Sequence, residues 1–159
     1  MAEEIQLVVF KLKTGDTVCE YGVPITQVQE IIPIATPTRL PQAPSFVEGI
    51  INLRGKIIPI IDLKKRFGLA SSELSSESRS VVVDVEGQTV GIMVDEVSEV
   101  LRLAFDSIEP PPALVGGITS EYLTGVGKME DRLLILLDMN KILSEGERAE
   151  LLSVGGKAS

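Results

Sequence analysis

The chain has 159 residues, a formal net charge of −8 and 44% hydrophobic residues, and it contains neither histidine nor tryptophan. The acidic balance, without any basic run, argues against a nucleic-acid partner, and the lack of histidine removes the commonest general base and metal ligand. No apolar run approaches the roughly 18–20 residues of a transmembrane helix and the acidic N-terminus is no signal peptide, so we expect a soluble, cytoplasmic protein of one domain or two small lobes.

The sequence of the first part of the chain predicts a series of short strands. Residues 5–12 alternate and are rich in β-branched side chains, which predicts a strand, and Gly15 marks the turn to a returning strand over 17–23. Residues 24–27 suit one helical turn, since proline is tolerated at a first helical position. A third strand is predicted over 28–35.

Alternation in the third strand separates its side chains onto two faces. Val28, Glu30 and Ile32 fall on one face, and Gln29 and Ile31 fall on the other. Glu30 is therefore a charge inside an apolar strand. Its ordinary explanation is a solvent-facing position.

A hairpin in the middle of the chain carries the clearest pattern. Two apolar strands, 50–54 and 56–61, flank a tight turn at Arg54 and Gly55, where glycine tolerates positive φ. The apolar runs are nearly continuous, so both faces of the hairpin should be covered. Pro59 cannot donate a hydrogen bond to a neighbouring strand, which predicts an edge or bulge position.

The second half repeats this organisation. Strands are predicted over 79–85, 89–94, 97–103, 121–128 and 132–137. The corresponding segments of the two halves are 8–12 with 81–85, 22–32 with 91–101, and 57–63 with 133–139. Short strands at this spacing suit small closed barrels, which leave no free edges.

We therefore expect a mainly β fold of two five-stranded β-barrels packed together, with short helices. The first barrel lobe should cover about residues 5–68 and the second about 79–138, with a C-terminal helix over 139–153. Asp62 and Asp138 each stand directly before a predicted helix, which favours helix capping over a catalytic carboxylate pair.

Catalytic motifs are missing from the sequence. Without histidine there is no Ser-His-Asp or Cys-His arrangement, and no nucleotide-binding glycine loop occurs. The single Cys19 lies in an apolar strand pattern and is expected to be a buried structural thiol. Glu30 and Arg54 could form a cross-strand ion pair, or they could be polar anchors on an interaction surface. The periodicity alone leaves both alternatives open.

Four separated segments resemble the CheW-like family of bacterial chemotaxis coupling proteins. Residues 49–63, Gly-Ile-Ile-Asn-Leu-Arg-Gly-Lys-Ile-Ile-Pro-Ile-Ile-Asp-Leu, resemble the family signature. Residues 21–31 resemble its first-half pattern, and residues 90–95 and 121–127 resemble its second half. The similarity covers about residues 5–150 in the family's order.

This resemblance implies a single CheW-like domain over 1–159, built from two SH3-like barrels, and a non-enzymatic adaptor without cofactor or metal. Such adaptors bridge the cytoplasmic tips of methyl-accepting chemoreceptors to the regulatory domain of the CheA histidine kinase. The chain would be recruited to membrane receptor arrays without membrane insertion, and would be a monomer when free.

The resemblance also implies which residues contact partners. Some match family contact positions or belong to the signature turn, and others would line a receptor groove between the barrels. The first set comprises Val28, Glu30, Ile31, Asn52, Arg54 and Gly55, and the second comprises Gly91, Val97 and Val100.

Two alternatives remain at this stage. The chain could be the isolated regulatory domain of a CheA-type kinase, which shares the fold. It could also be a small-ligand-binding barrel or a hydrolase, although the scarcity of aromatic residues, two Tyr and four Phe, and the lack of histidine argue against this class.

Overall fold

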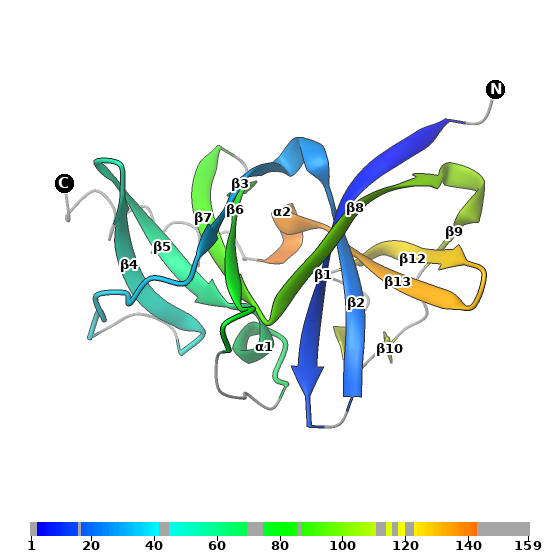
Figure 1. Ribbon diagram of the computed structural model, residues 1–159. Helices are drawn as coiled ribbons and strands as arrows, with labels where there is room; N and C mark the ends of the chain where they lie inside the picture. Colours follow the sequence, from blue (N-terminus) through cyan, green and yellow to red (C-terminus); the bar gives the residue numbers. More distant parts are fainter. Residues whose placement is uncertain are drawn as a thin grey trace.

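The computed structural model (Figure 1) describes residues 3–15, 17–41, 45–69, 75–85, 87–110, 114–115, 118–119 and 123–142. Its strands are β1 (Glu4–Thr14), β2 (Thr17–Pro24), β3 (Val28–Pro33), β4 (Val47–Leu53), β5 (Lys56–Asp62), β6 (Arg79–Val85), β7 (Gln88–Val94), β8 (Glu96–Ala104), β9 (Ile108–Glu109), β10 (Leu114–Val115), β11 (Ile118–Thr119), β12 (Leu123–Met129) and β13 (Arg132–Leu137). The helices are α1 (Leu63–Arg66) and α2 (Met139–Ile142), with 3-10 turns at Ile25–Gln27 and Phe105–Ser107.

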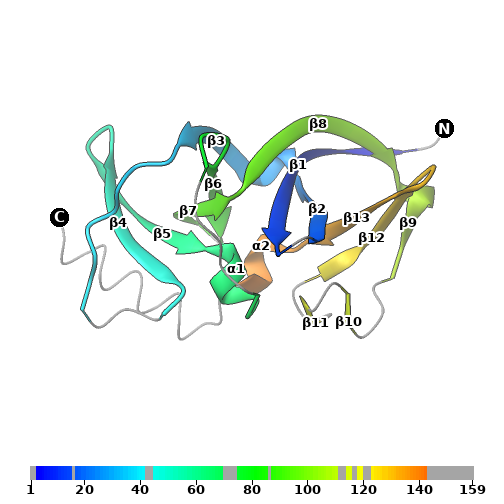
Figure 2. The same cartoon turned by 60° about the horizontal axis from the view of Figure 1, so that its bottom comes forward.

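The longer strands form two lobes that lie side by side, with α1 and α2 between them (Figure 2). The six-stranded lobe has the strand order β8-β1-β2-β13-β12-β9, and the five-stranded lobe has the order β3-β6-β7-β5-β4. The prediction of a mainly β fold with two five-stranded SH3-like barrels packed together is confirmed, and the two-residue β9 adds a short sixth strand to one lobe.

Each lobe takes strands from both predicted ranges of the chain. β1 and β2 pair with β8 and β13, whereas β6 and β7 pair with β3 and β5. The chain therefore crosses between the lobes after β2 and again after β7. This strand order differs from the predicted division at 5–68 and 79–138, because apolar alternation identifies a hairpin but does not specify which strand its edge will meet.

The internal repeat corresponds to matching positions in the two lobes. β3 and β8 both follow a crossing, and each pairs with the first strand of a hairpin, β6 or β1. The parallel pairs also match, since Gly22 lies opposite Leu136 in one lobe and Gly91 lies opposite Ile60 in the other. The alignment of 22–32 with 91–101 therefore relates equivalent strands.

One hydrophobic core is shared by the two lobes, and each lobe adds a smaller core of its own. The shared core contains a row of stacked rings, with Phe10 and Tyr21 at 5.8 Å and Tyr21 and Phe67 at 6.3 Å between ring centroids. Because Phe67 follows α1 of the five-stranded lobe, these rings cross the lobe boundary. Half-buried Cys19 packs against this shared core.

Pro59 corrects one expectation about strand position. β5 lies between β4 and β7, so Pro59 belongs to an interior strand and not to an edge. The pairing of β5 with β7 begins only at Ile60, and the sheet therefore tolerates the missing N–H. Residues 58–61 are buried, so both faces of β5 are covered as predicted, whereas β4 alternates between buried and half-buried residues and its Asn52 is exposed.

Both aspartates are helix caps. The Asp62 carboxylate accepts hydrogen bonds from the backbone N–H groups of Lys64 at 3.0 Å and Lys65 at 3.3 Å, and Asp138 accepts from that of Asn140 at 3.0 Å. α2 begins at Met139 as expected, and residues 143–153 of the predicted helix lie outside the described residues.

Replacing Asp62 with alanine should lower the free energy of unfolding by about 1–2 kcal/mol, because it leaves the first backbone donors of α1 without their acceptor. Chemical denaturation measures this change. Asp62→Ser retains a capping oxygen and should cost less. Equal costs for the two variants would contradict the capping role.

Within the described part of the chain, no helix has the length and apolar character needed to span a bilayer.

Candidate functional site

The β4–β5 turn projects Arg54 from the five-stranded lobe. Arg54 and Gly55 both have positive φ, 51° and 86°, as a two-residue type I′ hairpin requires, and Leu53 pairs with Lys56 across it. The Asn52 side-chain oxygen accepts a hydrogen bond from the Gly55 N–H at 2.8 Å. Arginine is an unusual residue at positive φ, and such local strain is concentrated at functional positions.

Glu30 on β3 is the partner of Arg54. The Arg54 guanidinium donates to the Glu30 carboxylate, and this hydrogen bond raises the pKa of Arg54 above its usual value. β3 and β4 are the two ends of the five-strand order, so the ion pair connects β3 with the hairpin at the other end of the sheet. The ion-pair alternative is therefore realised in the free protein.

This ion pair contributes little to stability. The Arg54 side chain is 68% exposed, and exposed ion pairs typically contribute between about zero and 1 kcal/mol. Glu30, Asn52, Arg54 and Gly55 form one surface, which we call the Arg54 surface. Its polar groups are held in place and open to a partner.

The register of β3 shifts between Val28 and Glu30, so the strand does not alternate regularly there. Val28 is half-buried against the shared core, and Ile31 is 40% exposed on the face away from Glu30. The prediction that Val28 shares a face with Glu30 is therefore wrong, because Val28 and Ile31 pair with Val83 and Val81, which lie on one face of β6, whereas Glu30 pairs with Val82. Ile31 is thus available to a partner, whereas much of Val28 is used in packing.

β8 carries the other two predicted valines, in the six-stranded lobe. Val97 is half-buried against the shared core, and Val100 is 52% exposed. The repeat aligns Val100 with Ile31, so each lobe exposes one aliphatic side chain at the equivalent strand position. Val97 lies two residues after Asp95, where the chain has just crossed between the lobes.

Gly91 differs from the other predicted contact residues because it is buried within β7. A Cβ atom at this position would lie 2.5 Å from the Ile60 Cδ1 atom on the neighbouring strand. The residue therefore permits close packing of β5 on β7, and no side chain reaches the surface from it.

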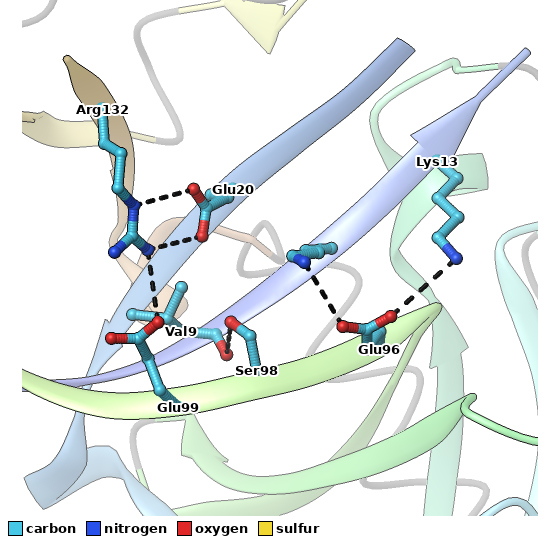
Figure 3. Close-up of polar contacts among 8 residues, drawn as sticks. Val9, Lys13, Glu20, Glu96, Ser98, Glu99 and Arg132 are labelled. Atoms are coloured by element: carbon cyan, nitrogen blue, oxygen red, sulfur yellow. Dashed lines mark hydrogen bonds and ion pairs between the residues drawn. The ribbon is translucent and has the colours of Figure 1, made fainter. Parts of the chain in front are cut away.

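Sequence reasoning missed an ion-pair cluster in the six-stranded lobe (Figure 3). Arg132 donates to both carboxylate oxygens of Glu20, at 3.1 and 2.7 Å, and also approaches Glu99 at 3.4 Å. The hydrogen bond to Glu20 raises the pKa of Arg132 above its usual value. The internal repeat aligns Glu99 with Glu30, and this alignment is the sequence feature that could have indicated a charged cluster here.

Nearby on β1 and β8, Lys11 and Lys13 approach the Glu96 carboxylate at 3.3 and 3.9 Å (Figure 3). The pKa of Glu96 is lowered, first by a hydrogen bond with Glu77 and then by one with Lys11. These carboxylates already have cationic or hydrogen-bonding partners. Among the described residues, no three His, Cys, Asp or Glu side chains gather as a metal site.

A cavity of about 380 Å³ lies over β2, β12 and β13, with Cys19, Arg132 and Leu133 in its lining. None of the predicted contact residues lines it.

A family model, the CheW-like domain, matches residues 6–147 of the chain. The chain belongs to the CheW-like domain family. Among its relatives, the chemotaxis protein CheW of Klebsiella aerogenes is 42% identical over 130 residues, covering 82% of this chain and 78% of that protein. The CheW of Treponema pallidum is 37% identical over 156 residues, covering 96% and 89% of the two chains.

A solved structure agrees with this assignment. The crystal structure of the scaffolding protein TtCheW from Thermoanaerobacter tengcongensis superposes with a TM-score of 0.81 at 39% identity, covering 92% of this chain and 96% of that one. The CheW-like chain is thus a non-enzymatic scaffold of the chemotaxis type, and the isolated kinase domain is not favoured.

Proposed function

We propose that this protein couples the cytoplasmic tips of methyl-accepting chemoreceptors to the regulatory domain of the CheA histidine kinase, and that it is recruited in this way to membrane receptor arrays. The observation that carries the proposal is the Arg54 surface. It combines a strained turn, an exposed arginine and an ordered carboxylate, and it contributes little to the stability of the fold.

The chemistry of this surface suits protein recognition. Arginine is favoured at binding hot spots because its planar guanidinium makes several directed hydrogen bonds. Glu30 holds Arg54 in place before a partner arrives, which lowers the entropy lost on binding. We assign this end of the five-stranded lobe to the kinase regulatory domain.

The receptor tip, a helical hairpin, would lie where the lobes meet. β8 begins at that boundary and presents Val97 and exposed Val100, while β3 presents Ile31 from the other lobe. A helix packed against such side chains gains affinity from a few aliphatic anchors, and neighbouring charges select the partner. The joint use of both lobes distinguishes this contact from the kinase contact.

Arg54→Ala should weaken binding of a CheA regulatory-domain fragment about tenfold, which corresponds to about 1.4 kcal/mol. Glu30→Ala should also weaken it, because Arg54 then loses the group that orients it. Isothermal titration calorimetry measures both affinities, and circular dichroism checks folding.

Arg39→Ala is the matched control. The Arg39 side chain is 83% exposed and its guanidinium lies 3.9 Å from Glu48, so Arg39→Ala removes an equal charge from an exposed arginine outside the Arg54 surface. Unchanged affinity of Arg54→Ala would overturn the assignment of this surface to the kinase. If the wild-type protein bound neither a receptor-tip fragment nor the kinase fragment, the adaptor proposal itself would be wrong.

A further inference from the structure

A buried ion pair lies at the point where the chain crosses from the five-stranded to the six-stranded lobe. Lys64 Nζ is 2.9 Å from Asp95 Oδ2 and 3.0 Å from Oδ1, and both side chains are only 6% exposed. Asp95 stands between β7 and β8, and Lys64 lies in α1. Neither residue belongs to the contact surfaces described above.

The pair connects elements of both lobes. Lys64 belongs to α1, which follows β5 and packs on β5 and β7 of the five-stranded lobe. From the six-stranded lobe, the backbone N–H of Lys13 on β1 donates to the Asp95 carboxylate at 2.7 Å, and its carbonyl accepts from Lys64 Nζ at 3.2 Å. The backbone N–H of Asp95 also donates to the carbonyl of Lys11 at 3.2 Å.

At the other crossing, no ion pair occupies the equivalent positions among the residues that the structure describes. The repeat aligns Asp95 with Thr26 and Lys64 with Asn140, and neither of these residues is charged. The ion pair is therefore an addition to one crossing of an otherwise repeated fold. It lies directly before the strand that presents Val97 and Val100.

A buried ion pair is a weak source of stability. The cost of removing two charges from water commonly offsets their attraction, and neutral replacements of similar shape are often equally stable. What such a pair does supply is a directed, fully hydrogen-bonded geometry, because both groups must keep their partners or leave a charge buried. This geometry here includes groups from both lobes.

We propose that Lys64 and Asp95 are positioning residues that fix the orientation of the two lobes, and thereby place the β8 valines for a receptor tip that contacts both lobes. This inference rests on the proposed function. Binding of a partner across the lobe boundary should then depend on the Lys64–Asp95 ion pair. Binding to the Arg54 surface, which lies within one lobe, should not depend on it.

The variant that tests this is Lys64→Met with Asp95→Asn. It removes both charges together, and the amide keeps an acceptor for the Lys13 N–H, so no buried charge is left alone. Lys65→Met is the matched control, because it removes the neighbouring lysine of the same helix, whose partner at 2.5 Å, Glu48, belongs to the same lobe.

Titration calorimetry with the two fragments should show that the double variant binds the receptor tip at least about tenfold more weakly. Its affinity for the kinase fragment should change less than about twofold. General destabilisation cannot produce this pattern. A second readout is independent of any partner. Spin labels are attached at Gln29→Cys on β3 and Lys128→Cys on β12, in a Cys19→Ser background. Pulsed electron paramagnetic resonance then measures the distance between the two lobes. The distance distribution should broaden in the double variant and stay unchanged in Lys65→Met.

Four outcomes separate the claims. A broadened distribution with selective loss of receptor-tip binding supports the proposal. An unchanged distribution, or an equal loss of both affinities, overturns it. If the wild-type protein binds neither fragment, the receptor-positioning role falls with the proposed function, and the distance measurement still decides whether the pair fixes the lobes.

Discussion

Replacing Gly49 with alanine is expected to be the most damaging single-methyl change in the described part of the chain, lowering the free energy of unfolding by about 3–5 kcal/mol. Gly49 has a φ of 146°, a conformation that other residues rarely adopt. A Cβ atom there would lie 2.2 Å from the carbonyl oxygen of Thr38 and 2.7 Å from its carbonyl carbon.

The clash cannot be relieved by a side-chain rotation, because the obstructing atoms are backbone. Thr38 and Ile50 are also joined by two hydrogen bonds, at 2.8 and 2.9 Å, which hold this segment against β4. The methyl group would therefore have to separate two main chains and break those bonds. Denaturant unfolding of the variant and the wild type measures the cost.

Gly87→Ala is the control for backbone strain alone. Gly87 also has a positive φ, 87°, but nothing lies within 4 Å of a Cβ atom at its position. Its substitution should cost only about 1–2 kcal/mol. Similar costs at the two glycines would show that the close approach of Thr38 is unimportant.

Gly91→Ala is expected to lower the free energy of unfolding by about 2–3 kcal/mol and to be rescued by a second substitution. The new methyl group would meet the Ile60 Cδ1 atom at 2.5 Å. Ile60→Val removes that one atom, at a cost of about 1 kcal/mol when made alone. The double variant should be more stable than the sum of the single variants predicts, by about 1–2 kcal/mol.

The same double-mutant cycle of Gly91→Ala and Ile60→Val distinguishes a packing role of Gly91 from a contact with a partner. If the glycine serves only the close packing of β5 on β7, any loss of receptor-tip binding in Gly91→Ala should be restored by Ile60→Val, together with stability. Additive energies in denaturant unfolding would contradict the packing explanation. Restored stability without restored binding would instead indicate that the methyl group obstructs a partner.

Much of the fold could be predicted because short-range patterns determine it. Alternation identified the hairpins, and Arg54 with Gly55 marked the turn that the structure contains. Asp62 and Asp138 were recognisable as caps because each directly precedes a helix. In each case the information lies within a few neighbouring residues.

The exchange of strands between the lobes could not be predicted from these patterns. β3 and β8 have similar apolar alternation, and each could satisfy the edge of either hairpin as far as alternation is concerned. The choice depends on the crossings at residues 24–27 and at Asp95, and on packing in the shared core. These are interactions between segments far apart in the sequence.

The candidate site was predictable in part for the same reason. Glu30 stood out as a charge within an apolar strand, and its pairing with Arg54 was one of two open alternatives. Nothing in the sequence distinguishes Lys64 from an ordinary surface residue, because it is followed by Lys65 and Arg66 and resembles another exposed, positively charged side chain. Its burial is evident only when α1 is packed against β1 and the residue that follows β7.

The strand exchange also orders events during synthesis on the ribosome. The five-stranded lobe uses one continuous stretch, from β3 to β7, and its sheet can close once Val94 has left the exit tunnel. The β1–β2 hairpin is made before the other strands of the domain, yet Tyr21 pairs with Ile135 and β1 pairs with β8. Strand pairings between segments far apart in the sequence form slowly, and a strand edge without its partner is prone to aggregation. Of the strands in this domain, β1 and β2 are therefore made first and paired last, and their time without partners lengthens with every pause in translation before residue 137.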